Sequence, residues 1–344
     1  MAHRPIRMAI IVRVGVVLAC AGGALAPQGA RAATAGVTAL VAVAPCARHV
    51  FVVHTYGHSG ISVLDAARGG VLRRDPVAGV SNAVAVDGRT GRVFATATGD
   101  HFAGHVSVLD AMSGRIVRTV PVGTAPFALA VDTRTGRVFV ANTGNLGRGG
   151  AVSVLDARTG AVRGAVALRG TPVALAVDES TQRAFVVEQG GSFLPKGAGD
   201  SVTLLNTRNG AIVRTIPVGA YPVAAAVDAQ SGRIFVANFE ANSVSVLDAR
   251  SGRVLRTVAV GINPLMTAVD ERTGRAFVVN QGDDTVSVLD GRTGTVMRII
   301  AVGKRPSALA VDGQTGRVFV ADQVDHDVSM LDAASGRLLR TITP

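Results

Sequence analysis

The chain contains no tryptophan, only two cysteines, and aromatic residues at 4% of its 344 positions. Two cysteines cannot form a disulfide framework or a zinc site with four thiolate ligands. Charged residues make up 17% of the chain and hydrophobic residues 48%, with a positive mean hydropathy, and this balance excludes a disordered protein. Long apolar runs are also scarce, whereas glycine, valine and alanine are abundant, so we expect many short strands rather than membrane helices.

The first 32 residues have the pattern of a secretory signal peptide. Residues 1–13 contain three arginines and no acid, residues 14–26 are apolar, and residues 30–32 read Ala-Arg-Ala. We therefore expect the chain to be exported, to the periplasm, the cell surface or the medium, after cleavage behind residue 32. The alternative is a lipoprotein signal cleaved before Cys20, because residues 17–20 resemble a lipobox.

Residues 33–344 consist of one unit repeated seven times. A Val-Ser-Val-Leu-Asp segment, with variation, begins at Ile61, Val106, Val152, Val202, Val244, Val286 and Val328. A segment around a phenylalanine recurs at Phe51, Phe94, Phe139, Phe185, Phe235, Phe277 and Phe319. Each unit also contains a segment related to Pro-x-Ala-Leu-Ala-Val-Asp and a closing segment related to Arg-Ile-Val-Arg-Thr-Val.

The four segments of a unit have the alternating pattern and the valine, isoleucine and phenylalanine content of short strands. From the axis outward we name them strand A (ending in Val-Asp), strand B (with the phenylalanine), strand C (Val-Ser-Val-Leu-Asp) and strand D. Four strands in seven units predict an all-β, seven-bladed β-propeller of four-stranded antiparallel blades, in a single domain over residues 33–344. Because every unit is complete, we expect blades one and seven to meet by face packing without exchanging a strand.

Most of the recurring polar residues are explained by the fold. The A–B and C–D connections contain Asp-x-x-Thr-Gly-Arg or a variant, in which the carboxylate accepts backbone N–H bonds and glycine supplies a positive φ. We interpret these aspartates as turn residues and not as a catalytic series. An arginine recurs in strand D, as at Arg118, where a charge on the outer edge of a blade opposes edge-to-edge pairing.

The end of strand B carries a family resemblance. The sequence is Phe-Val-Ala-Asn at 139–142 and 235–238, Phe-Val-Val-Asn at 277–280 and Phe-Val-Ala-Asp at 319–322. With Val-Ser-Val-Leu-Asp and the Val-Gly-x-x-Pro link, it resembles the YVTN family of β-propeller repeat proteins over residues 37–344. The resemblance implies an exported envelope protein. It extends more distantly to propellers that are lactonases, lyases or dehydrogenase subunits, so it does not assign a reaction.

The units differ mainly at the B–C connection. Successive C segments are 42 residues apart in the last three intervals but 45, 46 and 50 apart in the first three, and the excess falls at 98–105, 143–151 and 189–201. Because strands alternate in direction, the B–C and D–A connections share one face of the propeller. We expect this face to bind the ligand or partner protein. Its candidate ligand-binding residues are the aromatics outside strand B and three polar residues near the central mouth: Tyr56, Phe102, Phe127, Phe193, Tyr221, Phe239, Asn263, Lys304 and Arg305. Lys304 and Arg305 suit an anionic group.

Histidines and aspartates gather in the same connections of blades one, two and seven, which are neighbours in a closed ring. The candidate ligands for a divalent metal are His54, His58, His101, His105, Asp325, His326 and Asp327. The competing interpretation is that these are solvated loop residues, because no pair has a diagnostic spacing. A cofactor is therefore not expected, and a divalent metal is kept as the alternative.

The leading hypothesis is a non-enzymatic binding or scaffold protein for a small molecule, a glycan or an envelope protein. It rests on the lack of any Gly-x-Ser-x-Gly, P-loop or paired-cysteine motif. The alternative is a lactonase- or lyase-like enzyme with histidine or metal chemistry. Single-stranded nucleic-acid binding is a third hypothesis. The net charge of +11 favours it, but the chain has no tryptophan and only two tyrosines for base stacking, so nucleic acid is not an expected partner.

Overall fold

The computed structural model describes residues 16–17, 39–44, 49–54, 60–65, 70–76, 79–144, 150–190 and 199–343, and at 16–17, 39–44 and 53–54 it describes the backbone alone. Apart from one three-residue 3₁₀ helix, η1 (Asp100–Phe102), the described elements are strands. No described helix has the length and apolar character needed to cross a membrane. The signal peptide cleavage site and Cys20 lie outside the described residues, as do the candidate site residues Tyr56, His58 and Phe193.

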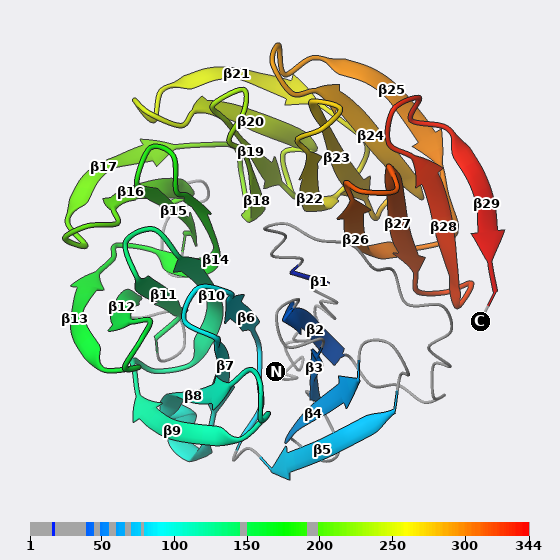
Figure 1. Cartoon of the computed structure of the whole chain (residues 1–344). Helices are drawn as coiled ribbons and strands as arrows, with labels where there is room; N and C mark the ends of the chain where they lie inside the picture. The colour runs from blue at the N-terminus through cyan, green and yellow to red at the C-terminus, as the bar shows by residue number, and fades with distance from the viewer. Residues whose placement is uncertain are drawn as a thin grey trace, which may run out of the picture.

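The strands form seven antiparallel sheets arranged around a common axis, which confirms the predicted all-β, seven-bladed β-propeller (Figure 1). Strands A are β2 (Ala39–Ala44), β6 (Val84–Asp87), β10 (Pro126–Asp132), β14 (Thr171–Asp178), β18 (Pro222–Asp228), β22 (Pro264–Asp270) and β26 (Pro306–Asp312). Strands B are β3 (His49–His54), β7 (Arg92–Thr98), β11 (Arg137–Asn142), β15 (Arg183–Gln189), β19 (Arg233–Asn238), β23 (Arg275–Asn280) and β27 (Arg317–Asp322). Strands C are β4 (Gly60–Asp65), β8 (Gly104–Asp110), β12 (Ala151–Asp156), β16 (Ser201–Asn206), β20 (Ser243–Asp248), β24 (Thr285–Asp290) and β28 (Asp327–Asp332). Strands D are β5 (Val71–Pro76), β9 (Ile116–Pro121), β13 (Val162–Ala167), β17 (Ile212–Pro217), β21 (Val254–Ala259), β25 (Val296–Ala301) and β29 (Leu338–Ile342).

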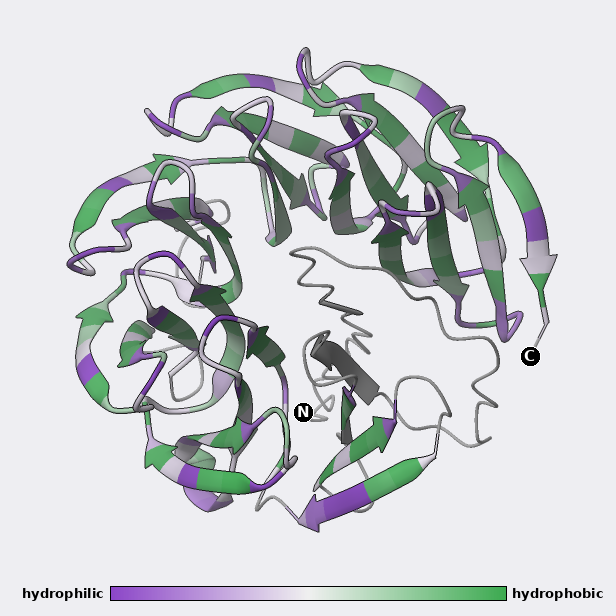
Figure 2. Cartoon of the chain, in the orientation of Figure 1, coloured by the Kyte–Doolittle hydropathy of each residue, from purple (hydrophilic) through white to green (hydrophobic). Residues whose placement is uncertain are grey.

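Each blade is apolar on both faces, because it must pack against a neighbour on either side. The phenylalanine of strand B has no exposed surface in blades one to six, and valines and leucines of strands B and C surround it. Figure 2 shows this hydrophobic character along the strands and hydrophilic bands across the outermost strands, where the predicted edge arginines lie. A single blade therefore leaves two apolar faces exposed to water, and only the stacked ring buries them.

The junction between blades seven and one is the least closed. Neighbouring strands A contact each other at the six other junctions, whereas at this one β26 contacts β1 (Val16–Val17), a short strand that pairs in parallel with β2. Phe319 and Met330, on blade seven, are only half-buried. The predicted face packing between these blades is thus incomplete. Among the described residues β29 pairs with β28 alone, so no strand exchange is seen there.

The turn aspartates bond as the sequence predicts. Asp228, which is completely buried, accepts hydrogen bonds from the backbone N–H groups of Gln230 and Ser231 at 3.1 Å and from the Ser231 hydroxyl at 2.7 Å. Asp87 and Asp312 bond in the same way to the threonine three residues later. These carboxylates hold the A–B turns and are not available for chemistry.

A buried asparagine at the end of strand B joins this strand to strand C. The Asn238 side-chain N–H donates to the hydroxyls of Ser243 and Ser245 at 3.1 and 3.0 Å, and Asn280 does the same in blade six. The glycine of the Val-Gly-x-x-Pro link packs on this amide, since a Cβ at Gly219 would lie 2.7 Å from the Asn238 side chain. This contact explains why asparagine and glycine recur together in the repeats.

Blade seven has a carboxylate in place of this amide. Asp322 is buried, and its Oδ2 accepts hydrogen bonds from Ser329 Oγ at 2.6 Å and Ser329 N at 3.2 Å. Burial, with the charge of Asp327 adding to it, raises the pKa of Asp322 to about 6. The folded protein therefore holds a proton at pH values where the unfolded chain has released it, and stability falls as the pH rises from about 4 to about 6.

We predict that Asp322→Asn, which restores the amide found in blade six, raises the free energy of unfolding at pH 8 by about 1–3 kcal/mol. The gain should shrink as the pH falls towards 4, because Asp322 is then protonated and carries no charge. Urea denaturation at several pH values measures it. The matched control Asn280→Asp should show the reverse, a loss that grows with pH. A gain from Asp322→Asn that is the same at pH 4 and pH 8 would contradict this account.

Candidate functional site

The B–C and D–A connections lie on one face, as predicted, and they are bonded to each other. We call this the loop face; its described B–C connections are 99–103, 143–144 with 150, 190 with 199–200, 239–242, 281–284 and 323–326. The backbone N–H groups of Val260 and Val302 in the D–A links donate to carbonyls of the preceding B–C connections at 3.0 Å, and that of Val122 donates at 2.9 Å to the carbonyl of the first residue of β8. The longer connections of blades two to four therefore lie on a face where hydrogen bonds between neighbouring connections fix the backbone.

Side chains of the B–C connections add a second bond between blades. Asn242 Oδ1 accepts the N–H of Asn263 at 2.8 Å, and Asp284 Oδ1 accepts the N–H of Arg305 at 2.7 Å. In blade four, Asp200 Oδ2 accepts the N–H of Tyr221 at 3.1 Å. We call these three acceptors the link caps. The sequence analysis does not single them out, although an Asn or Asp recurs directly before strand C at each position.

Blades two and three have glycine at the cap position. A Cβ at Gly104 would lie 1.9 Å from the carbonyl oxygen of Gly123, and one at Gly150 would lie 2.3 Å from that of Gly170. No side chain fits there, and the N–H of Ala125 is bonded instead by the carbonyl of Phe102 at 3.0 Å. The longer connections of blades two and three thus coincide with the loss of the side-chain cap.

Four residues directly before the link prolines, three of them candidates, have an unusual backbone conformation. Ala125, Tyr221, Asn263 and Arg305 have φ values of 50°, 54°, 53° and 52°. This left-handed conformation is unfavourable for residues with a Cβ, so the bonds described above must stabilise it. Thr171 differs because it lies within β14. The mouth residues are therefore positioned by their neighbours in the ring.

The aromatic candidates fall into three environments. Tyr221 and Phe239 pack together with ring centroids 6.0 Å apart, in a small cluster with Val223, Ala224 and Ala237. Phe127, from strand A of blade three, is partly buried against the core cluster that blades four and five form. Phe102 is the exposed one, at 47% of its surface. It follows His101 in η1, and both residues have positive φ values, 62° and 54°.

The polar candidates at the mouth form hydrogen bonds with the neighbouring B–C connections. The Asn263 side-chain amide donates to the carbonyl of Phe239 at 3.3 Å. The side chains of Lys304 and Arg305 are exposed, but Asp325 Oδ2 accepts the N–H of Lys304 at 2.8 Å and Asp284 caps Arg305. Two aspartates thus bond the backbone N–H groups of these two cationic residues.

The metal candidates are spread over several elements. His101 and His326 are exposed, at η1 and in the B–C connection of blade seven, and His105 is half-buried in β8. Asp325 is exposed, and Asp327 lies beside Asp322 at the start of β28. His54 ends β3, and its side chain is outside the described set, as is the whole of His58. Among the side chains that the structure describes, no three His, Cys, Asp or Glu lie together as metal ligands would.

Comparison with solved structures shows the same architecture in other proteins. A computationally designed protein, Ika8, matches with a TM-score of 0.68 and 18% identity, over 88% of this chain and 86% of its own. Hydrazine synthase of Kuenenia stuttgartiensis matches with a TM-score of 0.66 and 14% identity, over 86% of this chain and 95% of the matched chain. The fold is a β-propeller. At these identities the likeness concerns the fold alone.

The sequence itself matches no family model, and no curated protein matches it.

We predict that Asp284→Ala lowers the free energy of unfolding by about 1–2 kcal/mol, because the N–H of Arg305 loses its acceptor. Asp284→Asn is the matched control, since its amide oxygen can accept the same bond and it should retain most of the stability. Guanidinium chloride denaturation measures both variants. Equal stability of the two variants would show that Asp284 does not act as a link cap.

Proposed function

We propose that this chain is an exported propeller of the YVTN type that binds a ligand, a glycan or an envelope protein through its loop face and catalyses no reaction. The resemblance of its repeats and the pattern of its first 32 residues support the family and the location. The ring of blades supports a scaffold role, because it holds many separate connections on one face without a moving part.

Phe102 is the observation that carries the proposal. Its exposed ring lies in one of the longer B–C connections, on two successive residues with positive φ, beside a link to the next blade. Such a conformation costs about 1–2 kcal/mol per residue. A large apolar side chain is thus about half exposed to water on a strained backbone, and this arrangement does not by itself stabilise the blade. Contact with a partner would explain why it is kept there.

We predict that the loop face contacts the partner directly, and site-specific photo-crosslinking in cells that make the protein tests this. A photoreactive phenylalanine analogue is placed at Phe102 or at Phe239, where it replaces a similar side chain. The control position is Leu255 on β21, which is 48% exposed and so matches Phe102 in accessibility.

The proposal expects a covalent adduct with one cell component from Phe102 and Phe239, and none from Leu255. An adduct that forms from Leu255 but not from Phe102 would place recognition on the outer strands. The lack of any adduct from the two loop positions would also count against a binding role for this face.

A further inference from the structure

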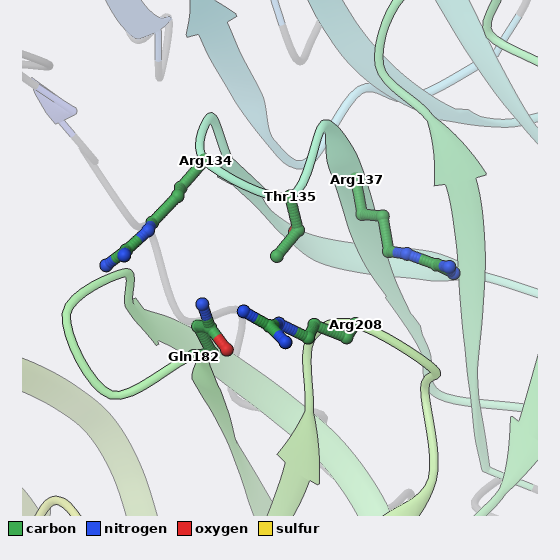
Figure 3. Close-up of a pocket in the computed structure, with 5 residues that line it drawn as sticks. All are labelled: Arg134, Thr135, Arg137, Gln182 and Arg208. Atoms are coloured by element: carbon green, nitrogen blue, oxygen red, sulfur yellow. The ribbon is translucent and has the colours of Figure 1, made fainter.

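A pocket of about 260 Å³ lies on the opposite face of the ring, between blades three and four. It is lined by Arg134, Thr135 and Arg137 from the A–B turn and strand B of blade three, and by Gln182 and Arg208 from two turns of blade four. Figure 3 shows Arg208 and Gln182 below Thr135, with Arg134 on one side and Arg137 on the other. The sequence analysis assigns this face, which consists of A–B and C–D turns, no role beyond holding the fold.

The pocket has three guanidinium groups with no carboxylate bound to them. Within the described part of the chain, Arg134, Arg137 and Arg208 form no ion pair. Arg134 makes one long contact, at 3.5 Å, with the backbone carbonyl of Glu179. The carboxylate of Glu179 is itself bonded to Thr133, by the N–H at 2.8 Å and the hydroxyl at 2.8 and 2.9 Å.

Arg137 is not paired with the carboxylate that lies opposite it in the sheet. In blades two, five and seven the first arginine of strand B pairs with the last aspartate of strand C, at 3.2, 3.3 and 2.9 Å. In blade three the equivalent Asp156 is bonded by Arg163 at 2.7 Å, from strand D. Arg137 and Asp156 are still opposite each other in the sheet, but the carboxylate is taken. The guanidinium of Arg137 is left for another partner.

Blade four lacks a carboxylate that the other described blades have in the C–D turn. The residue at the end of its strand C is Asn206, where the other described blades have aspartate. Asn206 Oδ1 accepts the backbone N–H of Arg208 at 2.8 Å, so the turn is kept and only the charge is lost. One change thus engages a carboxylate of blade three with an arginine of strand D, and the other replaces a carboxylate of blade four by an amide.

Gln182 is a third departure from the repeat. The other described A–B turns have glycine there, at Gly91, Gly136, Gly232, Gly274 and Gly316, with φ values between 64° and 66°. Gln182 has a φ of 57°, which is strained for a residue with a Cβ. Its carbonyl keeps the usual bond to the C–D turn, at 3.1 Å from the N–H of Thr207. What the substitution adds is an amide side chain in the pocket.

We infer that this pocket binds a phosphate monoester of a small hydroxyl-bearing molecule, such as a sugar phosphate. Guanidinium groups match the oxygens of a tetrahedral oxyanion in charge and geometry. The amide of Gln182 can bond a hydroxyl of the carrier. The volume is small for a drug-sized ligand, for which pockets start at about 300 Å³, but it exceeds by far the space of one water, about 30 Å³. The site is independent of the loop face.

Isothermal titration calorimetry at low ionic strength, with glucose 6-phosphate as the probe and glucose as its uncharged counterpart, tests the inference. The wild-type protein should bind glucose 6-phosphate and not glucose, and added salt should weaken the binding. The double variant Arg134→Gln with Arg208→Gln should lose at least about tenfold in affinity. Both arginines are exposed on turns, so the fold should be retained. Arg250→Gln, at the turn of blade five that corresponds to Arg208, is the control and should bind like the wild type.

The variant Gln182→Gly distinguishes a ligand-binding role of the Gln182 side chain from a purely structural one. It removes the side chain and relieves the left-handed strain, so the melting temperature should rise while the affinity for glucose 6-phosphate falls. A merely structural Gln182 would leave the affinity unchanged. No binding of glucose 6-phosphate to the wild type at low salt, or equal binding by the double arginine variant, would overturn the inference. Binding of inorganic phosphate as tightly as glucose 6-phosphate would overturn the part that concerns the carrier.

Discussion

The burial of two apolar faces on every blade is the constraint on which the rest of this structure depends. A four-stranded sheet with phenylalanine and valine on both sides is unstable alone, and it becomes stable only between two others. Seven such sheets close a ring, and the ring fixes the connections at both ends. Where blade seven packs incompletely against blade one, Phe319 is left half-buried.

The polar groups of the repeat serve this packing. Aspartates hold the A–B turns, asparagines join strand B to strand C, and the link caps tie each blade to the next. Because the backbone of the connections is held from several sides, it can sustain left-handed residues with a Cβ, as at Tyr221 and Arg305. Side chains at these places can vary without changing the ring, which is the property that a binding scaffold needs.

The sequence predicts the fold almost completely, because every unit repeats the same alternation of apolar residues and the same turn signals. It also predicts the loop face, since the direction of alternating strands and the lengths of the connections suffice. It does not predict that Phe127 packs against the core or that aspartates bond the backbone of Lys304 and Arg305, because both depend on contacts between blades. Packing across a blade junction has no fixed spacing in the chain.

The pocket on the face of the A–B and C–D turns could not be predicted from the sequence either. Gln182 in place of glycine and Asn206 in place of aspartate are visible in the alignment of the repeats, but each one alone is a tolerated variation of a turn. The structure adds that Gln182 lines one pocket with Arg137 and Arg208, and that Asp156 is bonded elsewhere. The functions proposed for this protein thus rest on the positions where the repeat is broken, and the fold rests on the positions where it is kept.

The most direct test of this division is a variant in which the departures are replaced by the residues found in the other repeats. This chain has Gln182→Gly, Asn206→Asp and the four-residue connection 239–242 in place of the longer B–C connections of blades two to four. The measurement is its melting temperature with and without glucose 6-phosphate, beside the wild type. The account predicts a melting temperature at or above that of the wild type and no shift with the ligand. A chain that melts well below the wild type, or that keeps the full shift, would contradict it.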